Sequence, residues 1–223
     1  MTNLDAVKTR HSVRSYLSKP IPEDIRKQLR EEIHRCNQAD DLHIQLVTEA
    51  PETFSGFLAR YGKFENVRNY IALIGPNTPD LDKKIGYFGE RLALFAQTLG
   101  LNTCWVAMTF RKGAAKAECE VSKREKLVCV LALGYGKTQG TSHKIKALDE
   151  ICSDTEQLPE WYRQGLECAL LAPTAMNQQK FRFSRTENFV SVKATGGFYS
   201  SVNIGIVKYH FELGAGTENF KWK

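Results

Sequence analysis

Two arginines near the start of the chain have the type and spacing that suit binding of a phosphate group. Arg10 and Arg14 lie four residues apart in the sequence Arg-His-Ser-Val-Arg, with the hydroxyl of Ser12 between them. Guanidinium groups form paired hydrogen bonds with phosphate oxygens, and a hydroxyl can bond a neighbouring polyol. The same composition is typical of a solvated basic turn, so these residues alone leave both interpretations open.

A second candidate is the sequence Ala-Pro-Thr-Ala-Met-Asn-Gln-Gln at residues 172–179. A helix that stops at Pro173 and continues into small and amide residues makes a rigid polar loop. Side-chain amides such as that of Asn177 offer both donors and acceptors, which suits the edge of a flat heteroaromatic ring. A plain helix-ending turn is the alternative.

Two further segments carry residues that could do chemistry. Residues 100–110 are unusually apolar for a loop, which indicates that they pack against something. Within them Cys104 could act as a nucleophile, but no partner histidine is identifiable, and an inert buried thiol is the commoner case. Lys144 and Lys146 lie in a basic loop after a Gly-Tyr-Gly sequence. That loop could hold a phosphate or be a solvated loop.

Hydrophobic periodicity predicts the elements that must position these residues. Helices are expected to begin near Ile21 and to cover residues 85–99, 159–171 and 202–213. Strands are expected around residues 42–46 and over 69–75, 127–133 and 189–194. Strict alternation of strand and helix is lacking, so the pattern predicts an α+β fold with a mixed or antiparallel sheet flanked by helices.

Part of the sequence is repeated. Residues 21–29 and 158–166 share the pattern aliphatic-Pro-Glu-x-x-Arg-x-x-Leu, and an Asn-Gln pair follows each copy at a similar distance. A third match, the pattern aromatic-x-x-x-Leu-Gly, ends at Gly100 and again at Gly214. Amphipathic helices converge on such patterns, but three matches in the same order favour two related halves. We place these halves at residues 1–150 and 151–223, the second being shorter, and expect them to pack as one globular unit.

Composition excludes several classes of protein. The chain has 223 residues, of which 42% are hydrophobic and 25% charged, enough to bury a sizeable core. No apolar run approaches the roughly 18 residues of a membrane span. Residues 1–10 contain no apolar h-region, so secretion is not expected. Six cysteines without a CxxC pair favour a reducing cytoplasm over a disulfide framework or a metal site. The net charge of +6 is scattered, whereas a nucleic-acid interface usually shows a basic stripe with aromatic residues.

Together these pieces resemble the nitroreductase superfamily of flavin-dependent oxidoreductases. The opening Arg-His-Ser-x-Arg, followed by Tyr16 and an Ile-Pro-Glu sequence, is similar to the family's N-terminal flavin-binding signature. Residues 172–183 resemble its Ala-Pro-Ser-x-x-Asn-x-Gln-Pro-Trp-x-Phe signature. Leu99-Gly100-Leu101 with Cys104-Trp105, and Leu133-Gly134-Tyr135, match later landmarks, so the resemblance covers nearly the whole chain.

The order of the two signatures is unusual for that family. In most members the Asn-x-Gln segment closely follows the arginine motif, whereas here the better copy lies in the second half of the chain. Family flavin sites lie at a dimer interface, where one subunit supplies the arginine motif and the other the Asn segment. The chain therefore resembles a two-repeat subgroup, an intramolecular pseudo-dimer in which each half keeps one share of a single site.

The resemblance implies flavin mononucleotide (FMN) as cofactor and NADH or NADPH as co-substrate, with no catalytic acid or base and no metal. Arg10, Ser12 and Arg14 would hold the phosphate, the ribityl chain and the pyrimidine edge, and His11 would add backbone or ring contacts. The other implied cofactor contacts come from three segments: Val106, Ala107, Met108 and Thr109; Lys144 and Lys146; and Pro173, Thr174, Ala175 and Asn177. Lys180 stands where the family usually has proline, and Met108 and Thr109 replace the acidic residue and glycine of some members.

The implied activity is reduction of nitro, quinone or related electron-poor small molecules by NAD(P)H, in ping-pong order through flavin N5. The alternative is a flavin-binding module without sustained turnover, for storage or sensing. A third hypothesis is a nucleic-acid or anionic-surface binder, marked by steep salt dependence. The expected partners are a nicotinamide donor and a small-molecule acceptor, with no nucleic acid and no membrane, and the chain is expected to be a monomer or a homodimer.

Overall fold

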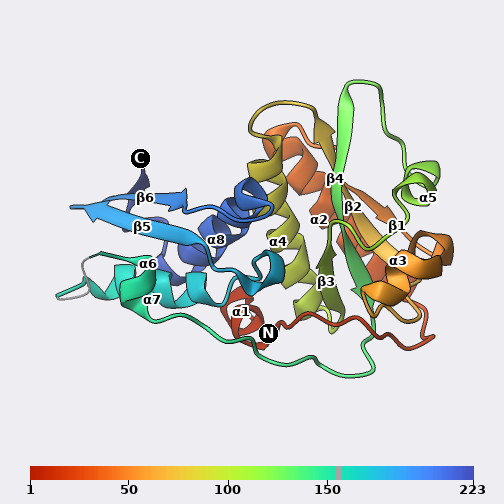
Figure 1. Cartoon of the computed structure of the whole chain (residues 1–223), viewed down its shortest axis with the longest axis horizontal. Helices are drawn as coiled ribbons and strands as arrows, with labels where there is room; N and C mark the ends of the chain where they lie inside the picture. Colours follow the sequence, from red (N-terminus) through yellow and green to blue (C-terminus); the bar gives the residue numbers. More distant parts are fainter. Residues whose placement is uncertain (154–156) are drawn as a thin grey trace. The chain divides into compact units, whose positions relative to one another are not determined.

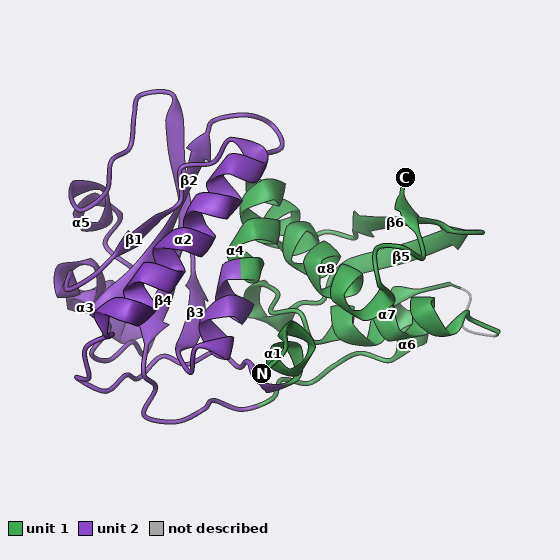
Figure 2. Ribbon diagram, turned by 180° about the vertical axis from the view of Figure 1, so that it is seen from behind, with its two compact units in different colours: residues 1–8, 82–91, 142–223 green, residues 9–81, 92–141 purple. Residues whose placement is uncertain are grey.

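The chain folds into two compact units, each with its own sheet, in a computed structural model that describes residues 1–153 and 157–223. Unit 1 comprises residues 1–8, 82–91 and 142–223, and unit 2 comprises residues 9–81 and 92–141 (Figure 2). These units are defined by contacts in space, and each is made of separate stretches of the chain. They therefore do not test the division into two halves that are related in sequence. The two related halves at 1–150 and 151–223 stay a prediction.

Unit 2 is built on a four-stranded antiparallel sheet in the order β1-β2-β4-β3 (Figure 1). Its strands are β1 (Gln45–Val47), β2 (Asn69–Pro76), β3 (Asn102–Val106) and β4 (Glu125–Gly134). The apolar run predicted as a central strand, residues 127–133, is buried throughout within β4. A strand that is apolar at successive positions must be covered on both faces, and this requirement explains why helices are needed around it.

The helices of unit 2 follow the predicted periodicity. They are α2 (Glu23–Asp40), the 3₁₀ helix η1 (Pro51–Phe54), α3 (Gly56–Tyr61) and α5 (Lys112–Ala117). Helix α2 begins directly after Pro22, with an acidic first turn, and buries Leu29, Ile33 and Cys36 at helical spacing. The longer α4 (Leu81–Thr98) contributes Leu81 and residues 92–98 to this unit and residues 82–91 to unit 1. The predicted helices from Ile21 and over 85–99 are thus confirmed.

The edge strand β1 is shorter than the alternation of apolar residues over 42–46 predicts. The side chain of Asn37, on α2, holds the backbone of Ile44: it donates to the carbonyl at 3.0 Å and accepts from the N–H at 2.8 Å. These groups are therefore taken before the strand begins at Gln45. The N–H of His43 still donates to the carbonyl of Ile74 on β2 at 3.0 Å, so main-chain pairing with β2 continues up to His43.

The prediction of an apolar loop over residues 100–110 is wrong for its first half, because Asn102–Val106 forms β3 at the edge of the sheet. Strand β3 pairs with β4 from Asn102 opposite Gly134 to Val106 opposite Val130. Its apolar character therefore comes from burial beside β4. The sequence Thr-Cys-Trp-Val carried the signal, since β-branched and aromatic residues favour strands.

Unit 1 combines a small sheet with packed helices. Its strands are β5 (Phe181–Thr186), β6 (Phe189–Ala194) and β7 (Lys221–Trp222), with β5 antiparallel and β7 parallel to β6. Its helices are α1 (Asn3–Thr9), α6 (Leu148–Ile151), α7 (Glu160–Leu170), the 3₁₀ helix η2 (Ala175–Asn177) and α8 (Ser200–Ala215). The elements predicted over 159–171, 189–194 and 202–213 correspond to α7, β6 and α8. The α+β class is confirmed.

Helix α8 is apolar on nearly every side, as a helix in the middle of a core must be. It crosses the first part of α4, also in unit 1, at a pair of glycines. A methyl group at Gly205 would overlap the carbonyl oxygen of Lys83, and one at Gly86 would overlap the carbonyl oxygen of Val202. The two backbones can approach this closely only because neither carries a Cβ at the crossing.

A buried hydrogen-bonded pair joins the same two helices. Nε2 of His210 on α8 lies 2.9 Å from Oε1 of Glu90 on α4, and neither side chain is exposed. Nδ1 of His210 lies 3.0 Å from the carbonyl oxygen of Cys168, and because a carbonyl only accepts, Nδ1 must donate. Nε2 and the carboxyl group therefore share one further proton, since two lone pairs would otherwise face each other.

Candidate functional site

The arginine segment (residues 10–14) lies along strand β3 in unit 2. It forms a parallel β-bridge with Thr103, whose carbonyl accepts the Val13 N–H at 3.1 Å. Further along the segment, the carbonyl of Arg14 accepts the N–H of Glu65 at 2.9 Å. The segment is therefore fixed on the protein by main-chain hydrogen bonds, which a solvated turn would lack.

Three side chains of the arginine segment, those of Arg10, Ser12 and Arg14, interact with the thiol of Cys104. Arg10 is 3% exposed, whereas Arg14 is exposed, with its guanidinium carbon 6.0 Å from the centroid of the Phe64 ring. Burial raises the pKa of Cys104, and the charge of Arg14, a hydrogen bond with Ser12 and the charge of Arg10 counter this only in part. The thiol is thus buried and protonated, which rules against the nucleophile hypothesis.

The loop that follows β3 (residues 107–110) carries the next predicted contacts. Val106 is buried at the end of the strand, Ala107 and Thr109 are partly buried, and Met108 is 68% exposed. No hydrogen bond joins the backbone N–H of Met108 or Thr109 to another described residue, so both can donate to a ligand. One strand, β3, therefore carries the arginine segment beside its first half and this loop at its end.

In unit 1, the lysine loop (residues 144–146) and the amide loop (residues 173–179) are tied together. The carbonyl of Lys144 accepts from the side-chain amide of Asn177 at 2.9 Å and from that of Gln179 at 2.7 Å. The Gln179 amide also donates to the side-chain oxygen of Asn177 at 2.9 Å. Asn177 therefore uses its amide to hold two loops together, whereas the resemblance assigned it to a flavin ring.

Two residues outside the predicted set complete this arrangement. Gln179 is 3% exposed, its N–H donates to the hydroxyl of Thr174 at 3.0 Å, and its side-chain oxygen accepts the Lys146 N–H at 3.0 Å. The side-chain oxygen of Asn203, on α8, accepts the Ala175 N–H at 3.0 Å. Gln179 belongs to the quoted motif and could have been found there. Asn203 lies inside a predicted helix, where nothing in the sequence marks it.

The predicted cofactor contacts divide between the two units. Unit 2 holds Arg10, His11, Ser12, Arg14, Val106, Ala107, Met108 and Thr109. Unit 1 holds Lys144, Lys146, Pro173, Thr174, Ala175 and Asn177. Each set is brought together within its own unit, and the prediction that both sets bind one flavin stays a prediction.

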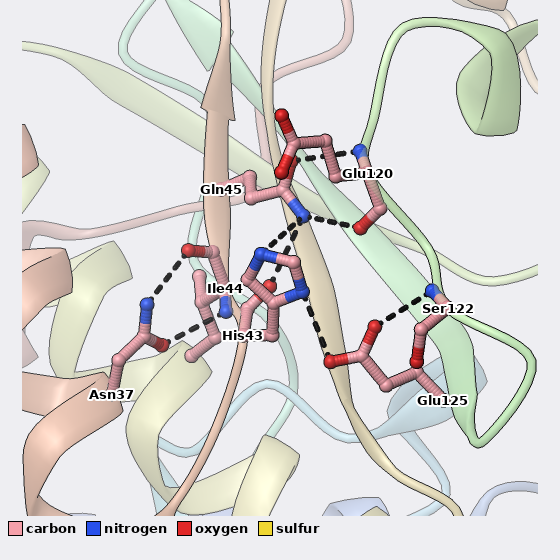
Figure 3. A network of polar contacts seen from close by, with 7 residues as sticks. All are labelled: Asn37, His43, Ile44, Gln45, Glu120, Ser122 and Glu125. Atoms are coloured by element: carbon pink, nitrogen blue, oxygen red, sulfur yellow. Dashed lines mark hydrogen bonds and ion pairs between the residues drawn. The ribbon is translucent and has the colours of Figure 1, made fainter.

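A separate polar network in unit 2 contains the elements of a histidine–carboxylate dyad (Figure 3). Nδ1 of His43 lies 3.0 Å from Oε1 of Glu125, and the amide nitrogen of Gln45 lies 3.2 Å from Nε2 of His43. An amide nitrogen can only donate, so Nε2 accepts and Nδ1 donates to the carboxylate. Gln45 is in turn paired with the backbone of Glu120 through two hydrogen bonds. The lone pair that a general base needs is therefore occupied, and the network fixes β1 to the loop before β4.

The same network predicts how stability responds to acid. Burial acts to raise the pKa of Glu125, but hydrogen bonds from Ser122 and His43 outweigh it, and the pKa lies below its ordinary value. A carboxyl group whose pKa is lowered by folding stabilises the folded state above its unfolded pKa, and this stabilisation is lost as the pH falls through the folded pKa. We expect Glu125→Gln to lower the melting temperature at about pH 7, and the difference from wild type to shrink below about pH 4.

Thermal unfolding followed by circular dichroism across this pH range checks the expectation. Glu118→Gln is the matched control, because Glu118 is an exposed carboxyl group nearby that has no hydrogen bond to another described residue. A destabilisation by Glu125→Gln that stayed constant from neutral to acid pH would show that the network does not depend on the ionised carboxylate.

No described helix combines the length and the apolar surface needed to span a membrane. The described residues contain no group of three or more His, Cys, Asp or Glu side chains placed to hold a metal ion. A cavity of about 280 Å³ lies on β5 and β6, and no predicted site residue lines it.

The residues of unit 2 match the chemistry of FMN. A phosphate, a polyol and a ring with polar edges need cations, hydroxyls and N–H donors, which Arg10, Arg14, Ser12 and the amides of the β3 loop supply. The hydroxyl of Thr103, bridged to the arginine segment, is buried and has no hydrogen-bond partner among the described residues. In unit 1, the same holds for the side-chain nitrogen of Gln178 in the amide loop. Buried polar atoms without partners are costly unless something bonds them, so both units offer groups that a ligand could satisfy.

Comparison with solved structures finds the same fold in several proteins. A putative nitroreductase from Thermotoga maritima is similar with a TM-score of 0.69 at 22% identity, over 96% of this chain and 83% of that one. An NADH dehydrogenase/NAD(P)H nitroreductase, named as putative, from Bacteroides thetaiotaomicron has a TM-score of 0.52 at 20% identity, over 70% and 98%. An FMN-dependent nitroreductase from Clostridium difficile has a TM-score of 0.50 at 14% identity, over 62% and 90%.

No curated protein matches the chain. Among protein families, the one described as "Putative TM nitroreductase" matches residues 3–215, which is nearly the whole chain. That match covers both units, including the arginine segment, the β3 loop, the lysine loop and the amide loop. The chain therefore belongs to this family, and with it to the nitroreductase superfamily.

Proposed function

We propose that the chain is an FMN-dependent NAD(P)H oxidoreductase that reduces nitro compounds, quinones or related electron-poor small molecules. Family membership supports an oxidoreductase, and one solved relative is named as FMN-dependent and another as an NAD(P)H nitroreductase. One observation carries the proposal: two kinds of ligand-binding group lie along the same strand. Arg10 and Arg14 are fixed beside β3, and the loop that follows β3 offers backbone N–H groups that are not hydrogen-bonded to described residues.

Bound FMN would supply the redox chemistry, because it accepts a hydride from a nicotinamide and returns two electrons to an acceptor. The chain's own residues bind and orient. Arg10 and Arg14 supply the positive charge that an FMN phosphate and an anionic flavin edge require, and Ser12 supplies a hydroxyl for the polyol. The backbone N–H groups of Met108 and Thr109 supply donors whatever side chains these residues carry. These positions can therefore differ from the acidic residue and glycine of some family members without losing the donors.

The unit 1 loops have a narrower part in this proposal. The ammonium groups of Lys144 and Lys146 are candidates for further phosphate contacts. The hydrogen bonds that hold this loop use the backbones of the two lysines, and Nζ of Lys146 also lies 3.9 Å from Oε1 of Glu150. Asn177 acts through Lys144, as the residue that holds the lysine loop in place. In this proposal the acceptor and the nicotinamide donor are both small molecules, and neither nucleic acid nor a membrane takes part.

A visible absorption spectrum, taken before and after anaerobic addition of NADH or NADPH, tests the proposal. We expect protein purified or reconstituted with FMN to show flavin absorption, to lose it on addition of the nicotinamide, and to regain it when a nitroaromatic compound or a quinone is added. Flavin that binds but stays oxidised would replace the reductase with a binding module. Failure of the protein to bind FMN at all would contradict both.

A further inference from the structure

Helix α3 in unit 2 presents an aromatic and cationic face to solvent. Phe57, Arg60 and Tyr61 are spaced i, i+3 and i+4, so their side chains leave the helix on the same side. Phe57 is 74% exposed and Tyr61 76%, and Arg60 is also exposed. The opposite side of the helix packs on the core through Ala59, which is 1% exposed. Large aromatic side chains this exposed are uncommon on a surface that binds nothing.

The end of this helix contacts the two parts of the candidate site in unit 2. A Cβ placed on Gly62, the residue after the helix, would lie 2.7 Å from the hydroxyl oxygen of Thr109 in the β3 loop. Two residues later, Phe64 lies under the guanidinium of Arg14. The neighbouring Glu65 donates its N–H to the carbonyl of Arg14. The chain from α3 to Glu65 therefore runs from the β3 loop to the arginine segment.

The residues just before α3 are bonded to Arg111, the residue that follows the β3 loop. The N–H of Arg111 donates to the carbonyl of Thr53 at 2.9 Å, and its guanidinium bonds the side chains of Glu52 and Ser55. The rings of Phe54 and Phe64 lie 5.2 Å apart in the core of unit 2. The aromatic face of α3 is therefore carried on a segment fixed at both ends beside the candidate site.

Charge around this face is positive and is not compensated. The side chains of Arg60 and Lys63 form no ion pair or hydrogen bond with a described residue, whereas two carboxyl groups of the same segment are engaged: Glu52 with Arg111 and Glu65 with Lys137. A guanidinium between two aromatic rings attracts a flat ring that carries an anionic group, because the rings stack on it and the cation pairs with the charge.

We infer that the face formed by Phe57, Arg60 and Tyr61 selects the electron acceptor, and that it favours flat aromatic acceptors bearing an anionic substituent. The inference rests on the proposed function, because the acceptor is reduced at the flavin that the neighbouring residues would hold. For a quinone acceptor the balance is NAD(P)H plus a proton plus quinone giving NAD(P)⁺ plus hydroquinone. Two electrons and two protons are taken up at the quinone oxygens, and the anionic group on the ring is unchanged.

The test compares two naphthoquinones, one carrying a sulfonate and one carrying a methyl group in its place, on protein reconstituted with FMN. The quantity measured is the ratio of kcat/KM for the sulfonate to kcat/KM for the methyl compound. The intrinsic reactivities of the two quinones affect this ratio equally in every variant, so a change in the ratio reports on the protein. We expect Arg60→Glu to lower this ratio about tenfold at low ionic strength, and added salt to lower it in wild type. Arg60→Lys should keep it within about twofold.

Lys123→Glu is the matched control, because it makes the same change of sign at an exposed residue of unit 2 before β4. It should leave the ratio within about twofold of wild type. Phe57→Ala combined with Tyr61→Ala should raise KM for both quinones about three- to tenfold through lost stacking. The FMN affinity and the rate of flavin reduction by NAD(P)H should stay unchanged in all these variants.

The outcomes separate the two proposals. If FMN binds and is reduced by NAD(P)H but Arg60→Glu leaves the ratio unchanged, the acceptor face is wrong and the proposed function stands. The same conclusion follows if Lys123→Glu lowers the ratio as much as Arg60→Glu, because net charge would then be the cause. If wild-type protein binds no FMN, or holds FMN that no nicotinamide reduces, the proposed function fails and this inference fails with it.

Discussion

Replacing Arg10 and Arg14 together with alanine is expected to weaken FMN binding by at least about a hundredfold. Each guanidinium removed costs hydrogen bonds to a charged group, which contribute about 1.5–3 kcal/mol each. Arg10 is buried, so a phosphate or flavin edge bound to it would be poorly solvated by water and would depend on it strongly. Titration of apoprotein with FMN, followed by quenching of flavin fluorescence, measures the change.

The matched control is Arg26→Ala combined with Arg30→Ala. These arginines have the same spacing of four residues, but they lie on α2 and pair with Glu23. They should leave FMN binding unchanged. Because removal of the buried Arg10 can also lower stability, Arg14→Ala alone is measured as well, since Arg14 is exposed and its loss should leave the melting temperature unchanged. If the double variant folds and binds FMN as wild type does, the arginine segment is not the cofactor site.

Replacing His210 with alanine is expected to lower the free energy of unfolding by about 3–5 kcal/mol. The change leaves the carboxyl group of Glu90 buried without the imidazole that shares its proton, and it removes the donor to the Cys168 carbonyl. Glu90 and His210 both lie in unit 1, so the substitution weakens the contact between α4 and α8 within one compact unit. Urea denaturation followed by circular dichroism measures it.

A double-mutant cycle distinguishes this pair from the simple loss of a buried side chain. In a Glu90→Leu background the carboxyl group is already gone, so His210→Ala should cost at least about 2 kcal/mol less than it does in wild type. Glu90→Gln should be milder than Glu90→Leu, because its amide nitrogen can still donate to Nε2. An equal cost of His210→Ala in both backgrounds would mean that the imidazole acts only by filling space.

Local patterns in the sequence predict most of the fold, because they are set by residues close together in the chain. The apolar run over 127–133 and the spacing of Leu29, Ile33 and Cys36 identify β4 and α2 without reference to the rest of the molecule. The errors occur where a distant or competing group decides. The side chain of Asn37 bonds the backbone of Ile44 just before β1, and burial beside β4 makes a strand of a segment predicted as a loop.

The sequence predicts which residues belong to the candidate site better than it predicts which hydrogen bonds they form. The motif identifies Asn177, but nothing near it in sequence indicates that its amide bonds the carbonyl of Lys144, 33 residues away. The same is true of Asn203, whose side chain fixes the N–H of Ala175 from inside a helix. Such contacts depend on tertiary structure, and a motif records only that a residue type is present. The assignment of all these residues to one flavin remains a prediction from the resemblance.

The hydrogen bonds between the amide loop and the lysine loop bear on the thermodynamics and rate of ligand binding. Asn177 and Gln179 are fixed by each other and by the backbone of Lys144 in the free protein, so their rotamers are set in advance. A side chain that must be ordered on binding costs about 0.5–1.5 kcal/mol in conformational entropy, and here that cost is met during folding. A ligand of these loops therefore meets a rigid surface, and its rate of association is not limited by loop rearrangement.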